Sequence, residues 1–155
     1  PFYYPTLIVN SLFIYWIGYV GFSKPSSFFS AVRTTAPPAD KWEPVQEALR
    51  RAMEEEEVFT NAKLTLPQFA QQVGLPARDI TQYVNEVKGM NFSEYLNHYR
   101  VKKVQRLMLD EEAQRYTLIA LAEAAGFSSK SSFNAIFKKE VGQTPTEFLR
   151  SRNAT

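Results

Sequence analysis

The chain has 155 residues, of which 18 are basic and 16 acidic, so its formal net charge at pH 7 is +2. This charge is too small to indicate nucleic-acid binding by itself. Cysteine is absent and histidine occurs once, as His98, which excludes disulfides and cysteine nucleophiles and argues against histidine-based metal sites. Because no nucleophile–base pair, metal cluster or phosphate-cradling loop occurs, we expect no enzyme activity, no metal and no cofactor.

Residues 1–23 carry no charged side chain, although they are rich in aromatic and aliphatic residues. About 20 helical residues suffice to span a bilayer core of about 30 Å. We therefore predict a hydrophobic helix here, the last membrane span of a longer protein, since the chain also begins at Pro1 rather than at a methionine. The alternative is an amphipathic helix packed on the soluble part. If the segment spans, Lys24 and Arg33 predict that the rest of the chain is cytoplasmic.

Residues 24–40 are rich in proline, serine and threonine, which predicts a linker. A helix is then expected from about Lys41 to Thr60. One side of this helix would carry Val45, Leu49, Ala52, Met53 and Glu56. The acidic run at its end, residues 54–57, is interpreted as a solvated face. Residues 41–57 have a net charge of −3 and residues 58–155 one of +4, so the basic part of the chain follows this run.

Residues 66–100 recur, in altered form, as residues 118–152. At an offset of 52 the matching positions are Leu66 and Leu118, Phe69 and Leu121, Ala70 and Ala122, and Gly74 and Gly126. At an offset of 53 they are Ile80 and Phe133, Val84 and Phe137, Gly89 and Gly142, Glu94 and Glu147, and Leu96 and Leu149. Each copy predicts a short helix, a glycine turn, a second helix, another glycine and a capped third helix. This order is typical of a helix-turn-helix.

Capping signals place the elements along the chain. Thr65, Asn91 and Thr144 are each followed three residues later by Gln or Glu, as in a capping box. We place the first helix-turn-helix at about 65–88, a linker helix at about 92–109 and the second helix-turn-helix at about 117–141, within a domain of residues 41–155. The linker helix would be about 27 Å long, close to the 34 Å of one DNA turn. The predicted fold class is all-α: two helix-turn-helix units joined by a long helix, a homeodomain-like tandem, after an extra hydrophobic N-terminal helix.

A recognition helix needs one apolar edge that anchors it and one polar edge that is free to enter the major groove. The predicted anchors are Ile80, Tyr83, Val84 and Val87 in the first unit and Phe133, Ile136, Phe137 and Val141 in the second. The outward residues are then Arg78, Thr81, Gln82 and Asn85, and Lys130, Ser131, Asn134 and Lys138. Arg and Lys can donate to guanine, and Gln and Asn can pair with adenine. Ser128 and Ser129 suit phosphate oxygens at a helix N-terminus.

One polar helix edge alone would fit an ordinary surface helix, but two copies with matching anchors, turns and caps favour a reader of double-stranded DNA. The alternative is a helical protein-interaction module of a membrane-tethered signalling protein, which would dock through these helices and residues 54–57. A steep salt dependence of binding to duplex DNA would favour the first hypothesis.

The sequence GFSSKSSFNAIFKKEVGQTPTEFLR (126–150) closely resembles the signature of the AraC/XylS family of bacterial transcription regulators. Residues 64–86 and 91–108 resemble the first unit and the linker helix of that family. The resemblance covers about residues 40–152. It implies a seven-helix domain that inserts both recognition helices into adjacent major-groove segments on one face of double-stranded DNA, with RNA polymerase as a further candidate partner. The resemblance predicts neither the oligomeric state nor a ligand.

Carried over by position, the resemblance implies roles for individual residues. The base-facing residues would be Arg78, Thr81, Gln82, Lys130, Ser131 and Asn134, and Lys138 and Lys139 would lie nearer the DNA backbone. Gln82 and Ala135 stand where many members have a longer basic side chain, which implies weaker sequence readout. Arg100 is expected to be structural and to pair with a carboxylate in the core. Residues 1–24 resemble the last membrane helix of members with a membrane-embedded sensor, which implies an anchor in the bacterial inner membrane.

Overall fold

Helix boundaries follow the capping residues in the part of the chain that the structure, a computed structural model, describes: residues 41–153, without the side chains of Gln114, Arg152 and Asn153. The elements are α2 (Glu43–Glu54), η2 (Val58–Thr60), α3 (Leu66–Val73), α4 (Ala77–Glu86), α5 (Phe92–Leu109), η3 (Ala113–Arg115), α6 (Leu118–Ala124), α7 (Lys130–Val141) and α8 (Pro145–Asn153). These residues form seven α-helices and no strand, so the predicted all-α fold is confirmed. The hydrophobic helix expected at 1–23 and the linker expected at 24–40 lie outside the described residues.

All three predicted capping boxes are present. The Thr65 side chain accepts from the Gln68 N–H at 3.4 Å, and the Gln68 side chain accepts from the Thr65 N–H at 3.0 Å. Asn91 and Glu94 form the same pair of bonds at the start of α5, at 3.0 and 3.1 Å. Thr144 and Glu147 do so at the start of α8. Each box satisfies backbone donors that a helix N-terminus otherwise leaves unpaired, so these helices begin where the sequence predicts.

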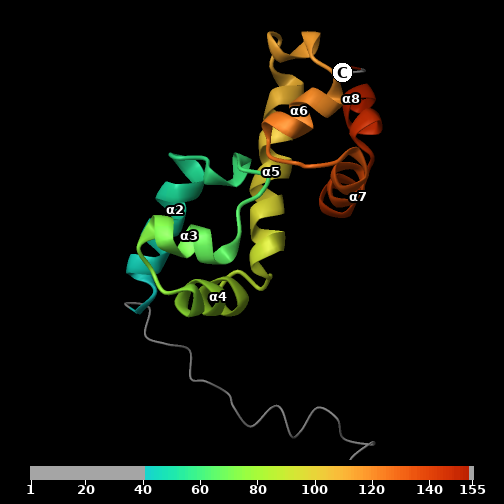
Figure 1. The fold of residues 1–155 in the computed structure, drawn as a ribbon. Helices are drawn as coiled ribbons and strands as arrows, with labels where there is room; N and C mark the ends of the chain where they lie inside the picture. Colours follow the sequence, from blue (N-terminus) through green and yellow to red (C-terminus); the bar gives the residue numbers. More distant parts are fainter. Residues whose placement is uncertain (1–40, 154–155) are drawn as a thin grey trace, which may run out of the picture. The chain divides into compact units, whose positions relative to one another are not determined.

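The long helix α5 belongs to both helix-turn-helix units. Its first half contributes Tyr95 and Leu96 to one buried cluster, and its second half contributes Val101, Val104 and Met108 to another. At about 100° per residue, these two sets lie on roughly opposite faces of the helix. Figure 1 shows the consequence, with α2, α3 and α4 on one side of α5 and α6, α7 and α8 on the other. One rigid helix therefore carries two cores.

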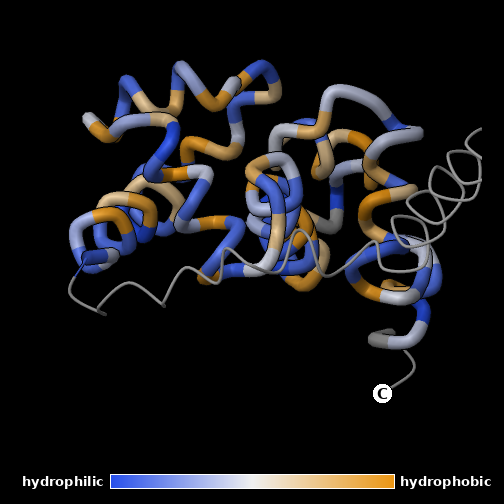
Figure 2. Tube along the Cα trace, turned by 90° about the horizontal axis from the view of Figure 1, so that it is seen from below, coloured by the Kyte–Doolittle hydropathy of each residue, from blue (hydrophilic) through white to orange (hydrophobic). Residues whose placement is uncertain are grey.

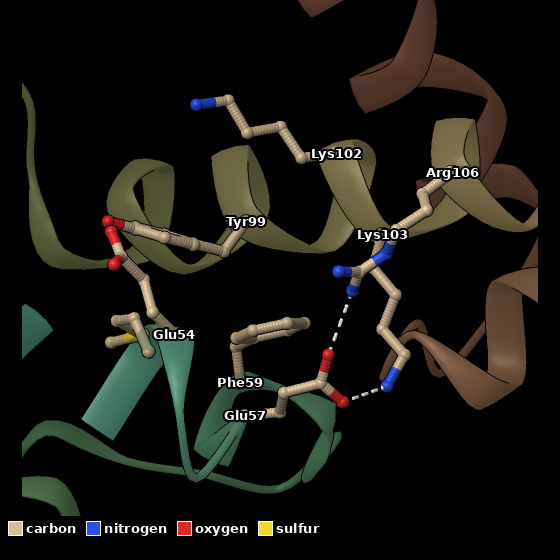
Figure 3. Close-up of a pocket in the computed structure, with 8 residues that line it drawn as sticks. Glu54, Glu57, Phe59, Tyr99, Lys102, Lys103 and Arg106 are labelled. Atoms are coloured by element: carbon tan, nitrogen blue, oxygen red, sulfur yellow. Dashed lines mark hydrogen bonds and ion pairs between the residues drawn. The ribbon is translucent and has the colours of Figure 1, made fainter. Parts of the chain in front are cut away.

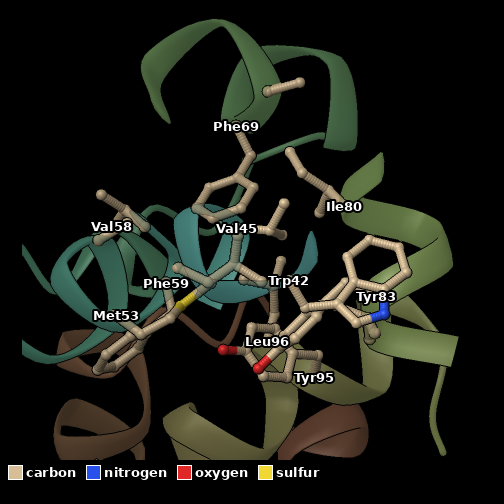
Figure 4. Close-up of a cluster of buried hydrophobic side chains, with 14 residues drawn as sticks. Trp42, Val45, Met53, Val58, Phe59, Phe69, Ile80, Tyr83, Tyr95 and Leu96 are labelled. Carbon is tan, nitrogen blue, oxygen red and sulfur yellow. The ribbon is translucent and has the colours of Figure 1, made fainter. Parts of the chain in front are cut away.

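Both cores are built from the repeated positions. In the first, Phe69 of α3 and Ile80 of α4 are fully buried (Figure 4). Val84 of α4 is fully buried as well. The equivalent residues of the second core, Leu121, Phe133 and Phe137, are buried as well. Burying one such side chain contributes about 1.5–3 kcal/mol. The matched apolar positions therefore fix the recognition helices α4 and α7 on their supports, as the sequence predicts.

Two predictions about helix ends are wrong. The helix expected from Lys41 to Thr60 ends at Glu54, because Glu57 adopts a left-handed backbone conformation with φ of 47° and the chain then turns into η2. Val87, expected as an anchor of α4, is instead its C-cap residue and is 48% exposed. The first helix therefore ends six residues before the predicted Thr60, and α4 ends one residue before Val87.

The acidic run is only partly a solvated face. Glu54, Glu55 and Glu56 are exposed, but the half-buried Glu57 forms ion pairs with Lys103 and, at 2.9 Å, with Arg106 of α5. Figure 3 shows the Glu57 carboxylate between the ends of these two cations. The interpretation of residues 54–57 as a solvated face is therefore wrong for Glu57, whose ion pairs attach η2 to α5.

Within residues 41–153, no helix combines the length and the apolar character that crossing a bilayer demands. Figure 2 shows hydrophobic and hydrophilic positions interspersed along the coloured helices. The predicted membrane span lies outside these residues and is not addressed by this finding.

The ion pairs of Glu57 predict a pH-dependent contribution to stability. A hydrogen bond from Lys103, aided by Arg106, holds the pKa of Glu57 below its ordinary value of about 4.3. The pairs therefore stabilise the fold above about pH 4.3, and this stabilisation is lost as pH falls through the lowered pKa. We expect Glu57→Gln to reduce the free energy of unfolding at pH 7 by up to about 1 kcal/mol, and by less at pH 3.

Urea unfolding at several pH values measures this difference. Glu111→Gln is the control, because Glu111 is exposed and forms no ion pair within residues 41–153. A Glu57→Gln deficit that is the same at pH 3 and pH 7 would contradict an electrostatic role.

Candidate nucleic-acid interface

Each unit presents the second helix of its helix-turn-helix with one apolar face buried and the opposite edge exposed. Gly74 follows α3 and Gly126 follows α6, both with positive φ, and these turns lead into α4 and α7. Positive φ values are readily adopted by glycine only, so these residues permit the sharp change of direction. The two exposed helix edges are the candidate interface.

On α4 the three predicted base-facing residues lie together. Arg78 is exposed, Thr81 and Gln82 are half-buried, and all three line a surface hollow of about 410 Å³ together with Leu66 and Ala77. The Thr81 hydroxyl donates to the Ala77 carbonyl at 2.9 Å. Gln82 Nε2 donates to the Glu86 carboxylate at 3.0 Å. Two of the three side chains are therefore held in place by hydrogen bonds along their own helix.

On α7 the predicted base-facing residues Lys130, Ser131 and Asn134 are all exposed. They lie opposite Phe133 and Phe137, whose rings pack edge to face at 5.6 Å in the second core. The other two predicted anchors, Ile136 and Val141, are half-buried and pack on that core. The spacing of α7 therefore separates a polar edge from an apolar one, as the sequence predicts.

The serines that precede α7 have different roles. Ser129 is the N-cap, and its Oγ accepts the Ser132 N–H at 3.2 Å. Its Oγ also lies 3.3 Å from the Ser131 Oγ. Ser128 is exposed and precedes the cap. The Ser129 side chain thus already accepts the Ser132 N–H, while the N–H groups of Lys130 and Ser131 in the first turn remain available for an anion.

The two lysines near the end of α7 also differ. Lys138 is exposed and forms no ion pair within the described residues, whereas Lys139 Nζ donates to Glu94 of α5 at 2.9 Å. This hydrogen bond raises the pKa of Lys139 and lowers that of Glu94. The next residue, Glu140, lies 3.2 Å from His98 Nδ1 of α5. Lys139 therefore ties α7 to α5, a contact that sequence reasoning did not find because it joins distant residues.

Arg100 has the structural role that was expected, but its predicted carboxylate partner is wrong. Its Nε donates to the Phe59 carbonyl at 2.8 Å, and Nη2 donates to the Asn61 carbonyl at 3.0 Å. Phe59 lies in η2, and Asn61 is the C-cap residue, whose carbonyl also accepts the Leu64 N–H at 3.1 Å. Burial lowers the pKa of Arg100. The guanidinium thus holds η2 against the middle of α5 and is not part of the exposed interface.

The described residues contain no group of three or more His, Cys, Asp or Glu side chains placed to bind a metal ion. The exposed side chains of the candidate interface on α4 and α7 are hydrogen-bond donors and acceptors, together with isolated positive charges. Such edges suit recognition of a polar surface rather than a covalent reaction.

The sequence matches known proteins over this part of the chain. The helix-turn-helix domain family matches residues 69–151, more than half of the chain. The "HTH-type transcriptional activator RhaR" of Enterobacter sp. (strain 638) is 30% identical over 98 residues, which are 61% of this chain and 33% of the relative. The chain spans about a third of the length of the curated relatives it matches.

Solved structures share the fold. The DNA-binding domain of AdpA, described as the global transcriptional factor and solved in complex with a target DNA, has a TM-score of 0.59 and 20% identity, covering 72% of this chain and 94% of that one. An AraC-type transcriptional regulator from Chromobacterium violaceum has a TM-score of 0.58 and 22% identity, covering 70% and 94%. With its two units on one shared helix and the family match across both of them, the chain belongs to the helix-turn-helix family of AraC/XylS type.

Proposed function

We propose that residues 41–153 are the sequence-specific double-stranded-DNA-binding part of a transcription regulator, with α4 and α7 in adjacent major-groove segments. The observation that carries the proposal is the pairing of two exposed polar helix edges on cores that share α5. The 18 residues of α5 extend over about 27 Å, comparable with the 34 Å between major grooves on one face of DNA. The relative named as a transcriptional activator and the AdpA domain bound to DNA support the same conclusion.

The exposed residues suggest a division of roles. Arg78 and Lys130 would donate to guanine, Gln82 and Asn134 would pair with adenine, and Thr81 and Ser131 would add hydroxyl contacts. Ser128, Ser129 and Lys138 would contact phosphates through side chains and the first turn of α7. Lys139 was predicted to face a phosphate too, but in the free protein its ammonium is paired with Glu94, so it would reach DNA only by leaving that carboxylate.

Base readout predicts a large and selective effect of single substitutions. The preferred duplex would be selected from a random library and its affinity measured by gel-shift titration at fixed salt. We expect Arg78→Ala or Lys130→Ala to weaken binding by about 1–3 kcal/mol, and to relax the preference for particular base pairs, because a donor to a base edge is lost.

Arg51→Ala is the matched control, since Arg51 is an exposed arginine of α2 that belongs to neither recognition helix. It removes the same charge and should leave affinity and preference nearly unchanged. If Arg78→Ala and Lys130→Ala both behave like Arg51→Ala, α4 and α7 do not read bases.

Phosphate contacts predict a different signature. Binding that releases counterions weakens linearly with the logarithm of salt concentration, by about 0.9 per phosphate neutralised. We therefore expect Lys138→Ala to reduce this slope by about 1 while leaving base preference unchanged. Fluorescence anisotropy on the selected duplex across a salt series measures the slope. A flat salt response of the unmodified protein would instead favour the protein-interaction module.

Three exposed hydrophobic residues are candidates for an additional protein contact. Leu109, Tyr116 and Ile119 are large hydrophobic residues of the second unit that are each more than a third exposed. They lie at the end of α5, after η3 and in α6, outside the polar edges of α4 and α7. A regulator bound to DNA could offer such a surface to RNA polymerase, the partner predicted from the resemblance.

We also propose that the intact protein is anchored in a bacterial inner membrane, with the DNA-binding part on the cytoplasmic side, where DNA lies. The support is the uncharged sequence of residues 1–23, followed by Lys24 and Arg33. Fractionation of the full-length protein should place it in the membrane pellet, and high salt should not release it. Recovery in the supernatant would contradict the anchor but not the DNA-binding proposal.

A further inference from the structure

Gly126 is one point at which the second unit contacts η2, a segment that packs in the core of the first unit. Gly126 follows α6 in the second unit, and a Cβ atom at this position would lie 2.5 Å from the Phe59 carbonyl and 2.8 Å from the Thr60 carbonyl. It would also lie 3.0 Å from Arg100 Nε. Both carbonyls belong to η2, in the first unit, and are backbone atoms that no rotamer change can move aside. Gly126 is therefore a position where the second unit packs closely on the core of the first. Lys139 and Glu140 of α7 make further contacts, with Glu94 and His98 in the first half of α5.

The repeat supplies an internal comparison. Gly74 occupies the equivalent position in the first unit, with φ of 69° against 97° for Gly126. A Cβ atom on Gly74 would meet nothing within 4 Å. Gly74 is thus needed only for its backbone conformation, whereas Gly126 is needed for its backbone conformation and for the close approach of another segment.

Arg100 completes this contact from the side of α5. Its Nε donates to the Phe59 carbonyl, the same atom that lies nearest the Gly126 Cβ position. Arg100 is half-buried, and a charged group that loses part of its hydration is stabilised by hydrogen bonds, so its bonds to η2 hold that segment in place along α5. The position of η2 in turn determines how closely the α6–α7 turn can approach.

Movement at Gly126 would be passed on to α7. The next residue, Phe127, is buried, and its ring lies 5.3 Å from that of Phe133 in α7. Close-packed interiors transmit such displacements rather than absorbing them. The contact between Gly126 and η2 therefore bears directly on the distance between α7 and the first unit.

We propose that Gly126 and Arg100 are positioning residues that set the separation of α4 and α7, and with it the spacing of the two DNA segments that one molecule accepts. The second half of this statement rests on the proposed function, whereas the first half does not. Two features constrain this spacing: both cores share α5, and the second unit packs on η2 at Gly126.

The test measures the separation without DNA. The chain has no cysteine, so spin labels can be attached only at introduced cysteines, Asn85→Cys on α4 and Ala135→Cys on α7, both of which replace exposed residues. Electron–electron double resonance on the full chain then gives the distance distribution. We expect Gly126→Ala to shift or broaden this distribution, and Gly74→Ala, the control that also places a side chain at positive φ but without the clash, to leave it unchanged.

Arg100→Lys keeps the charge but loses the planar fork, and it tests the same contact if circular dichroism shows that Gly126→Ala does not fold. An unchanged distribution in every folded variant of Gly126 and Arg100 would overturn the proposal. So would an equal shift in Gly74→Ala.

The DNA readout uses the selected duplex and versions with one base pair inserted or removed between its two halves. For the unmodified protein, we expect each altered spacing to weaken binding at least about tenfold, which corresponds to 1.4 kcal/mol. Gly126→Ala should reduce the difference in affinity between the selected duplex and the duplexes of altered spacing, or change the spacing that is bound most tightly. If the unmodified protein binds no duplex, the proposed function fails, while the distance measurement still decides whether Gly126 and Arg100 position the helices.

Discussion

The placement of η2 on α5 depends on the hydrogen bonds from Arg100 to the carbonyls of Phe59 and Asn61. A partly buried guanidinium loses hydration, and it regains hydrogen bonds only where acceptors are held in a fixed place. The carbonyls of Phe59 in η2 and of its C-cap residue Asn61 are such acceptors, and the Asn61 carbonyl is also held by the Leu64 N–H at 3.1 Å. The bonds join a residue in the middle of α5 to the segment that Gly126 packs against, so one side chain relates α5, the first unit and the second unit. The ion pairs of Glu57 with Lys103 and Arg106 attach the other end of η2 to the same helix.

Both cores share α5. This explains why the sequence of α5 predicts the length of the helix clearly but does not predict which of its faces is buried. Tyr95 and Leu96 point into the first core, and Val101, Val104 and Met108 point into the second from roughly the opposite side. An ordinary surface helix has a single apolar stripe along its length. The apolar residues of α5 do not form such a stripe, because they face two cores. The capping box at Asn91 still predicts where the helix starts, because capping is a local interaction between residues three apart. Local signals therefore locate α5, whereas its role becomes visible only once both cores are assembled.

Features of the fold and of the candidate site that depend on local signals could be predicted from the sequence, whereas features that depend on contacts between distant residues could not. The matched apolar positions predicted the burial of Ile80, Val84, Phe133 and Phe137, since periodicity within one helix determines which side faces a core. The outward positions of Arg78, Lys130, Ser131 and Asn134 follow from the same argument. Other features depend on contacts between residues that are far apart in the sequence. They are the left-handed conformation of Glu57, the carbonyl partners of Arg100 and the pairing of Lys139 with Glu94. A single sequence contains no periodic signal for them.

The two recognition helices pack on the same long helix, but their outward side chains differ in whether they are already held by hydrogen bonds. On α4, Thr81 and Gln82 are already hydrogen-bonded to their own helix, so Gln82 would have to leave Glu86 before its amide could pair with a base. On α7, Lys130 and Asn134 are exposed without such bonds in the described residues, and ordering them on DNA would cost side-chain entropy. The first cost is a lost hydrogen bond and the second a lost freedom of movement, each of about 1 kcal/mol. On the proposed function, a rigid spacing between α4 and α7 offsets these costs, because once one helix is seated the other needs no further search for its groove.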